Sequence, residues 1–167
     1  MNEQSKKELK EAFEALKKPV KKDEHLNPLY VHLKGCLKNE NKKLAPSKVT
    51  SSSYTKNYDI VFSDEDGTHA IELKSISSSF GKNFNNRIEE MSGQALLSDG
   101  ILKTKSLSYV FVVNELKETV AATYITRLKE CAAFLIRRKY LKNFVLIRIK
   151  KSGFVYEENY SFENWKW

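Results

Sequence analysis

The stretch YDIVFSDEDGTHAIELKSI, residues 58–76, decides the fold of this chain. Its two apolar runs, 58–62 and 69–76, are rich in the β-branched and aromatic residues that strands favour. Between them lies Asp66-Gly67, a pair that tolerates the positive φ angles of tight turns. The stretch therefore predicts two antiparallel strands joined as a β-hairpin.

Helical and strand patterns lie on both sides of this hairpin. Before it, apolar residues at helical spacing predict helices over 3–18 and 26–39, and polar residues predict an exposed loop over 39–56. After it, the patterns predict, in order, a polar loop over 77–83, a helix over 84–98, a strand over 108–113, a helix over 123–140 and a strand over 144–149. Strands reached through helices favour parallel pairing, so we expect an α/β fold with a mixed sheet and helices on both faces.

The composition is that of a basic protein of about one domain. Of the 167 residues, 41% are apolar, which is enough for an ordinary core. The formal net charge of +8 fits a phosphate-rich partner without proving one. No apolar stretch approaches a membrane span and the N-terminus is charged from its start, so we expect a cytoplasmic protein with no membrane partner. The two cysteines lie far apart, which excludes a disulfide framework and a cysteine-based zinc site.

Charged residues interrupt the second strand of the hairpin. Glu-x-Lys occurs four times in the chain, but only Glu72-Leu73-Lys74 lies inside an apolar, β-branched run. Alternate side chains of a strand share a face, so Glu72 and Lys74 should project together while Ile71 and Leu73 face the other way. Buried charge is costly unless it is paired, so this arrangement needs a physical reason.

Asp59, in the first strand, supplies a third charge. Antiparallel pairing around the turn brings it toward the end of the hairpin that holds Lys74. Two neighbouring carboxylates repel unless a cation lies between them, and oxygen ligands select a hard ion such as Mg²⁺. A lysine beside metal-bound water can orient that water or neutralise charge on a phosphate, which suits phosphodiester hydrolysis. Acids and lysines on strands also form ordinary cross-strand ion pairs on a solvated face, and the pattern alone leaves this alternative open.

Other common catalytic motifs are missing from the sequence. It holds no Gly-rich phosphate loop and no Gly-x-Ser-x-Gly elbow. Its three histidines lie at no metal-ligand spacing from one another. These features argue against a nucleotide-binding NTPase and against a zinc enzyme.

The spacing of the hairpin charges resembles a known nuclease motif. Asp59, twelve intervening residues and then Glu72-Leu73-Lys74 look like the PD-(D/E)xK motif. Tyr58 stands in place of the proline that usually precedes the aspartate. The resemblance therefore extends to the charged residues of the motif and not to its first position.

A longer similarity follows the motif. Residues 71–95, IELKSISSSFGKNFNNRIEEMSGQA, resemble type II restriction endonucleases of the XhoI-like group, which cut the palindrome CTCGAG. The similarity is dense over residues 57–97 and weaker over 128–149. It implies a Mg²⁺-dependent DNA endonuclease, of the type II restriction class.

The same resemblance implies an architecture. It would be a restriction-endonuclease-like α/β/α core within a single nuclease domain over residues 1–167. That domain would comprise a helical N-terminal part at 1–50 and a catalytic core at 57–149.

The resemblance also implies a role for each site residue. Asp59 and Glu72 would be metal ligands as well as catalytic residues, with the Leu73 carbonyl as a further ligand. Lys74 would be the catalytic lysine. Glu90 would lie on a helix near the active centre as an accessory acid, although acids in a first helical turn are also favoured by the helix dipole alone.

Residues 77–87, next to the motif, carry a dense set of hydrogen-bond donors. Asparagine can pair bidentately with adenine and arginine with guanine, whereas lysine and serine more often hold phosphate. The same residue types are also ordinary loop formers. Phe80 and Phe84 are better explained as anchors of this loop than as stacking residues. The residues that we expect to contact DNA are Ser77, Ser78, Lys82, Asn83, Asn85, Asn86 and Arg87.

A palindrome-cutting enzyme would act on double-stranded DNA as a symmetric homodimer. Restriction would also require a cognate DNA methyltransferase to protect the host. Two alternatives stay open: a non-catalytic DNA-binding module, and a repair or structure-specific nuclease on the same fold. The segment 114–122 is only nine residues long, and XhoI-like enzymes are longer chains. If base readout depends on an insertion there, the target would differ, or the protein would nick DNA or need a partner chain.

Overall fold

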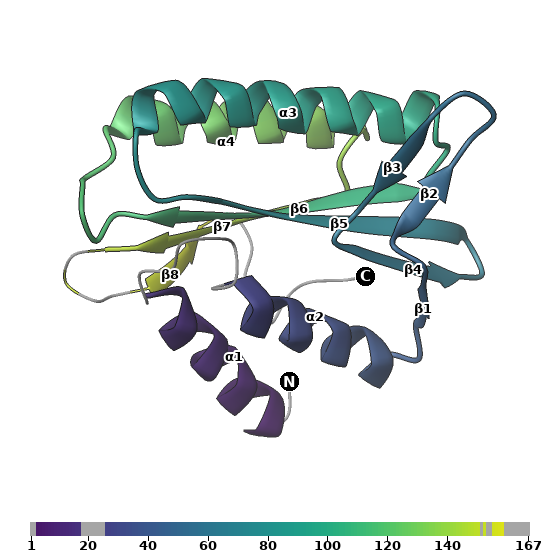
Figure 1. Ribbon diagram of the computed structural model, residues 1–167, viewed down its shortest axis with the longest axis horizontal. Helices are drawn as coiled ribbons and strands as arrows, with labels where there is room; N and C mark the ends of the chain where they lie inside the picture. Colours follow the sequence, from purple (N-terminus) through teal and green to yellow (C-terminus); the bar gives the residue numbers. More distant parts are fainter. Residues whose placement is uncertain (1–2, 18–25, 151, 153–154, 159–167) are drawn as a thin grey trace.

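The computed structural model describes residues 3–17, 26–150, 152 and 155–158, which form a mixed β-sheet between two layers of helices (Figure 1). The helices are α1 (Glu3–Leu16), α2 (Asn27–Asn39), α3 (Phe80–Gly100) and α4 (Ala122–Arg137). The strands are β1 (Lys43–Ala45), β2 (Lys48–Thr50), β3 (Thr55–Asn57), β4 (Ile60–Asp64), β5 (Gly67–Ile76), β6 (Ser106–Asn114), β7 (Asn143–Ile149) and β8 (Val155–Glu158). Helices α3 and α4 cover one face of the sheet, and α1 and α2 cover the other.

The main sheet has the strand order β1-β4-β5-β6-β7-β8, and β2 and β3 form a separate two-stranded ribbon. Strands β4 and β5 are the predicted hairpin, with Ile60 opposite Ile71 and Asp64 opposite Gly67. Glu65 and Asp66 form the turn, and Gly67, at φ +135°, begins β5. Strands β5, β6 and β7 run parallel, because α3 and α4 carry the chain back between them. The predicted α/β class, with a mixed sheet flanked by helices, is confirmed.

The two faces of the sheet bury two apolar clusters. On β5, Ala70 and Ile76 pack on the side of α3 and α4, whereas Ile71 and Leu73 pack on the side of α1 and α2. This alternation is the one that the sequence predicts, and it places the buried Glu72 on the α3 side. None of the described helices combines the length and the apolar character needed to cross a membrane.

The exposed loop predicted over 39–56 is wrong in part, because short strands form within it. Strand β1 pairs with β4, with Leu44 opposite Phe62, and so extends the main sheet. Strands β2 and β3 pair with each other, and Val49 packs against the core cluster on the α3 side. A strand of three residues carries too little pattern to be predicted, since its neighbours in the tertiary structure decide its conformation.

The loop predicted over 77–83 is wrong in part, because residues 77–79 form a loop but α3 begins at Phe80. Phe80 and Phe84 lie one helical turn apart and are both buried, so their predicted role as anchors is confirmed. The Phe84 ring stacks on Tyr124 of α4 with ring centroids 5.4 Å apart. Burial of these rings outweighs the low helix propensity of the asparagines around them.

Candidate active site

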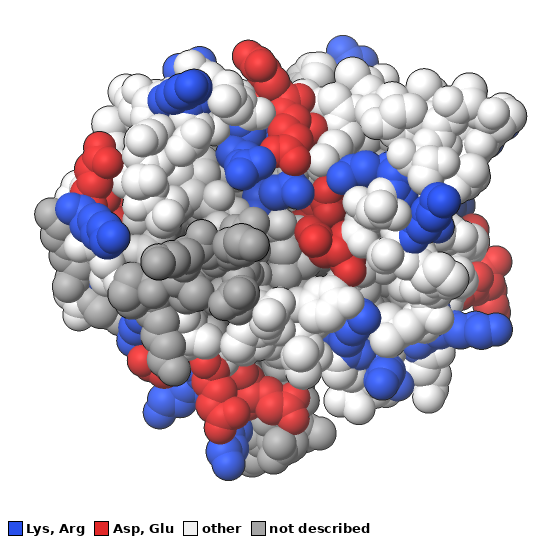
Figure 2. Space-filling model, viewed as in Figure 1, with Lys and Arg blue, Asp and Glu red and all other residues white. Residues whose placement is uncertain are grey.

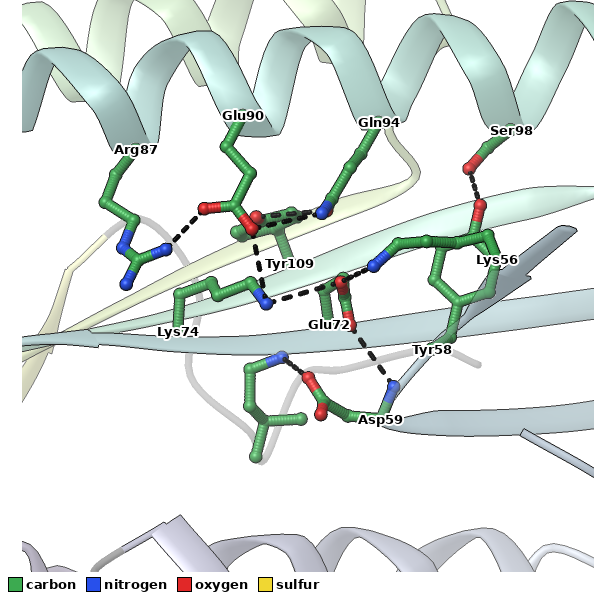
Figure 3. Close-up of polar contacts among 11 residues, drawn as sticks. Lys56, Tyr58, Asp59, Glu72, Lys74, Arg87, Glu90, Gln94, Ser98 and Tyr109 are labelled. Carbon is green, nitrogen blue, oxygen red and sulfur yellow. Dashed lines mark hydrogen bonds and ion pairs between the residues drawn. The ribbon is translucent and has the colours of Figure 1, made fainter. Parts of the chain in front are cut away.

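The end of the β4–β5 hairpin brings Asp59, Glu72 and Lys74 together (Figure 3). Asp59 directly precedes β4, and its backbone N–H donates to Glu72 Oε2 at 3.2 Å. The backbone N–H of Leu73 donates to Asp59 Oδ2 at 2.8 Å. The Lys74 ammonium lies 3.4 Å from Glu72 Oε1. The convergence predicted from antiparallel pairing is therefore present in the structure.

Glu72 lies beneath the surface and is 1% exposed. Its Oε1 lies 2.8 Å from Lys56 Nζ and 3.4 Å from Lys74 Nζ, and both lysines are partly exposed. This carboxylate is buried, so an ordinary ion pair on a solvated strand face does not describe it. Two ammonium groups instead compensate the cost of burying it.

Helix α3 supplies the opposite wall of the site. Figure 3 shows Arg87, Glu90 and Gln94 directed from α3 toward the sheet. Glu90 Oε1 lies 3.4 Å from Lys74 Nζ, and Glu90 Oε2 lies 2.5 Å from Arg87 Nη1. Gln94 Nε2 donates to Glu90 Oε1 at 3.2 Å, and Gln94 Oε1 accepts from the Tyr109 hydroxyl of β6. The structure thus places Glu90 beside Lys74, where its role as an accessory acid stays a prediction.

Burial and neighbouring charges shift the protonation of three of these groups. Burial, and then the adjacent Glu72 carboxylate, raises the pKa of Asp59 to about 6. Burial disfavours the charged form of Lys74, but Glu72, Glu90 and Asp59 outweigh it and raise the pKa of the ammonium. Burial also opposes ionisation of Glu90, yet Arg87 and Lys74 lower its pKa. These shifts favour the protonated, cationic form of Lys74 and the ionised carboxylate form of Glu90.

The Asp59 and Glu72 carboxylates offer oxygen ligands to a hard cation. Burial is the largest cause of the raised pKa of Asp59, and the adjacent Glu72 carboxylate adds to it; a cation between the two carboxylates would oppose both effects. Mg²⁺ is commonly bound through one or two carboxylates and otherwise by water and substrate phosphates. Within the described residues, no group of three acidic, histidine or cysteine side chains could enclose a metal ion. The donor set therefore fits an open, hydrated cation and not a closed structural metal site.

A cleft of about 370 Å³ opens over the site on the side of α2. Asp59 and Lys74 line it together with Asn27 and Tyr30 of α2. In the view of Figure 2, basic and acidic side chains meet near the middle of the visible surface. A substrate can reach Asp59 and Lys74 through the cleft, whereas Glu72 is covered.

The residues predicted to contact DNA lie at the start of α3 and just before it, not in one loop. Asn83 uses its side chain within the protein, because its Nδ2 donates to the Ser78 carbonyl at 2.7 Å. Arg87 is likewise engaged by Glu90. The other predicted residues are exposed beside the site: Ser77, Ser78, Lys82, Asn85 and Asn86.

Sequence reasoning missed Lys56, Gln94 and the α2 side of the cleft. Lys56 lies sixteen residues before Glu72, in a stretch predicted as loop, so no periodic signal marks it. Gln94 follows Glu90 by one turn of a helix that was predicted, and this spacing could have indicated their contact. Tyr30 carries no local signal, since only tertiary packing brings α2 to the hairpin.

No protein-family model matches the sequence, and no curated protein matches it either. Among solved structures, the SfsA protein of Pyrococcus furiosus in complex with Ca²⁺ is 16% identical with a TM-score of 0.37; the alignment covers 80% of this chain and 60% of SfsA. An fdxN element excision controlling factor protein from Anabaena variabilis is 14% identical with a TM-score of 0.35, over 74% of this chain and 91% of that one. This chain thus spans about 60% of the length of SfsA. TM-scores below 0.5 carry no functional argument, so the function is inferred from the geometry of the site itself.

Proposed function

We propose that the protein is a metal-dependent nuclease that hydrolyses phosphodiester bonds in DNA. The observation that carries this proposal is the convergence of Asp59, Glu72 and Lys74 at one end of a hairpin, beside a cleft open to solvent. The same residues form the pattern that resembles the PD-(D/E)xK motif. The net charge of +8 supports a polyanionic substrate.

Each side chain of the site would have a separate role in this hydrolysis. Asp59 and Glu72 would hold Mg²⁺, with the Leu73 carbonyl as the further ligand that the resemblance implies. Bound there, Mg²⁺ would polarise a phosphoryl oxygen and lower the pKa of a water molecule. Lys74, a cation between Glu72 and Glu90, is placed to orient the attacking water and to neutralise charge that develops on the phosphate. Glu90 positions the Lys74 ammonium and is itself fixed by its contacts on α3.

We further propose that cleavage is sequence-specific, as in the type II restriction endonucleases that residues 57–97 resemble. Exposed donors beside the site support this, because Asn85 and Asn86 can contact base edges and Lys82 can hold a phosphate. A palindromic target in double-stranded DNA would require a homodimer. A cognate methyltransferase would then protect the host DNA.

The proposal is tested by cleavage of plasmid DNA in Mg²⁺ by the wild type and by Lys74→Ala, with EDTA as the metal-free control. Lys117→Ala is the matched variant, because Lys117 belongs to another Glu-x-Lys sequence, whose Glu115 pairs with Arg148 at 2.6 Å. We expect the wild type and Lys117→Ala to cut at similar rates. Lys74→Ala should lose roughly 100-fold or more in rate, the size typical of removing one group that stabilises transition-state charge.

The products distinguish the finer proposals. Discrete fragments support a restriction enzyme, whereas a smear keeps the nuclease and removes its sequence specificity. Cleavage by Lys74→Ala at the wild-type rate would refute the assigned site. DNA binding without cleavage by any of the proteins would favour a non-catalytic DNA-binding module.

A further inference from the structure

Lys56 reaches the site from outside the main sheet. It lies on β3, one strand of the β2–β3 ribbon. Its Nζ is 2.8 Å from Glu72 Oε1, closer than that of Lys74 at 3.4 Å, and it lies 5.4 Å from the centroid of the Tyr58 ring. Figure 3 shows Lys56 and Lys74 approaching Glu72 from opposite sides. The deepest carboxylate of the site therefore has one cation from the sheet and one from the ribbon.

These two lysines differ in how firmly they are held. Lys74 belongs to β5, inside the main sheet, and also pairs with Glu90 at 3.4 Å. Lys56 belongs to a ribbon whose two strands pair with each other, and Glu72 is the acid that it pairs with among the described residues. The Lys56 side chain is 23% exposed and that of Lys74 is 21% exposed, so both border on water. On leaving Glu72, Lys56 would therefore give up its one carboxylate partner among the described residues, whereas Lys74 is also tied to Glu90.

A bound metal ion would weaken the contact between Lys56 and Glu72. A divalent cation on Asp59 and Glu72 would compete with the Lys56 ammonium for the Glu72 oxygens and would repel it. A backbone phosphate of DNA offers the negative charge that a displaced ammonium requires. Without a metal ion the site is neutral, because its described cations Lys56, Lys74 and Arg87 face the carboxylates of Asp59, Glu72 and Glu90.

We propose that Lys56 is a substrate-binding residue that changes partners: it neutralises Glu72 in the metal-free protein and contacts a DNA phosphate when a divalent cation occupies Asp59 and Glu72. This inference rests on the proposed nuclease function and adds a regulation of the same site. The metal-free protein keeps its carboxylates compensated. The β2–β3 ribbon engages DNA through Lys56 once the site is loaded.

Lys56→Met is compared with Lys48→Met in two measurements that do not depend on cleavage. Lys48 is the matched control, because it pairs in register with Asn57 and so projects from the other face of the same ribbon. Mn²⁺, which also takes oxygen ligands, is titrated into each protein, and its free fraction is followed by electron paramagnetic resonance. Fluorescence anisotropy then gives the affinity for a labelled DNA duplex in Ca²⁺ at several salt concentrations.

We expect Lys56→Met to bind Mn²⁺ about fivefold more tightly than the wild type, because the competing ammonium is gone. The same variant should bind DNA more weakly, and its slope of log affinity against log salt should fall by about 1, the loss of one phosphate contact. Lys48→Met should retain the wild-type Mn²⁺ affinity. Thermal unfolding in EDTA checks that each variant is folded.

Equal or weaker Mn²⁺ binding by Lys56→Met would overturn the inference, since Lys56 would then support the site instead of competing within it. Tighter Mn²⁺ binding with unchanged DNA affinity and salt slope would overturn the phosphate contact. If the wild type binds no Mn²⁺ and cuts no DNA, the proposed function falls and the inference falls with it. If the wild type does both and Lys56→Met behaves like Lys48→Met, only the inference falls.

Discussion

Asp59, a proposed metal ligand, lowers the stability of the metal-free protein when it is ionised. Its carboxylate lies next to Glu72, and burial and that neighbour raise its pKa to about 6. An acid with a raised pKa holds more protons in the folded state than in the unfolded state, here between about pH 4 and pH 6. The free energy of unfolding therefore falls as pH rises through this interval. At neutral pH the metal-free protein bears the cost of a buried Asp59 carboxylate beside Glu72, which a bound cation would lower.

The Asp59→Asn substitution should therefore stabilise the metal-free protein near neutral pH. The amide oxygen can still accept the Leu73 N–H but carries no charge to repel Glu72. We expect the free energy of unfolding to rise by about 1–2 kcal/mol near pH 7 and to change little near pH 4. Urea unfolding in EDTA at the two pH values measures this, with the exposed Asp66→Asn as control. An Asp59→Asn protein no more stable than wild type near pH 7 would argue against repulsion at this position.

At the scale of elements, the β4–β5 hairpin could be predicted because its signals are local. The turn forms at Glu65 and Asp66, with Gly67 at φ +135° directly after it, and the turn specifies the strand register. That register brings Asp59 beside Glu72. The approach of Asp59 to Glu72 could therefore be predicted from the sequence alone.

The start of α3 and the β2–β3 ribbon could not be predicted in this way. Serine and asparagine favour loops locally, so the signal at residues 77–87 opposed the helix that burial of Phe80 and Phe84 imposes. Lys56 lies on a strand of three residues whose conformation depends on packing against distant segments. The ion pair between Lys56 and Glu72 could not be predicted for the same reason.

Phe84→Ala should destabilise the protein by about 3 kcal/mol or more, because Phe84 is fully buried among the rings of Phe80, Phe111 and Tyr124. Its exposed neighbour on the same turn provides the control, since Asn85→Ala should change stability by less than about 0.5 kcal/mol. Urea unfolding of the two variants compares them directly. A cost below about 1 kcal/mol for Phe84→Ala would show that this ring does not anchor α3.

At the scale of the whole molecule, packing of the two helical layers on the sheet completes the site. Tyr30 comes from α2, Lys56 from the ribbon and Glu90 from α3, and they surround the hairpin charges. The order of elements predicted the α/β class, whereas the approach of these three side chains depends on how the layers pack. The molecule carries a charge of +8 around a site whose own described charges balance. A polyanion is thus attracted by the surroundings while the carboxylates remain compensated.

The most direct test of the proposed metal site is a Mn²⁺ titration of the wild type, Asp59→Asn and Asp66→Asn, followed by electron paramagnetic resonance. Asp66 is an exposed acid in the turn at the other end of the same hairpin, so it controls for general loss of negative charge. We predict equal Mn²⁺ affinity for the wild type and Asp66→Asn. Asp59→Asn should bind at least about tenfold more weakly, since even outer-shell changes at metal sites have effects of this size. Wild-type affinity in Asp59→Asn, or no Mn²⁺ binding by the wild type, would contradict a metal site at Asp59 and Glu72.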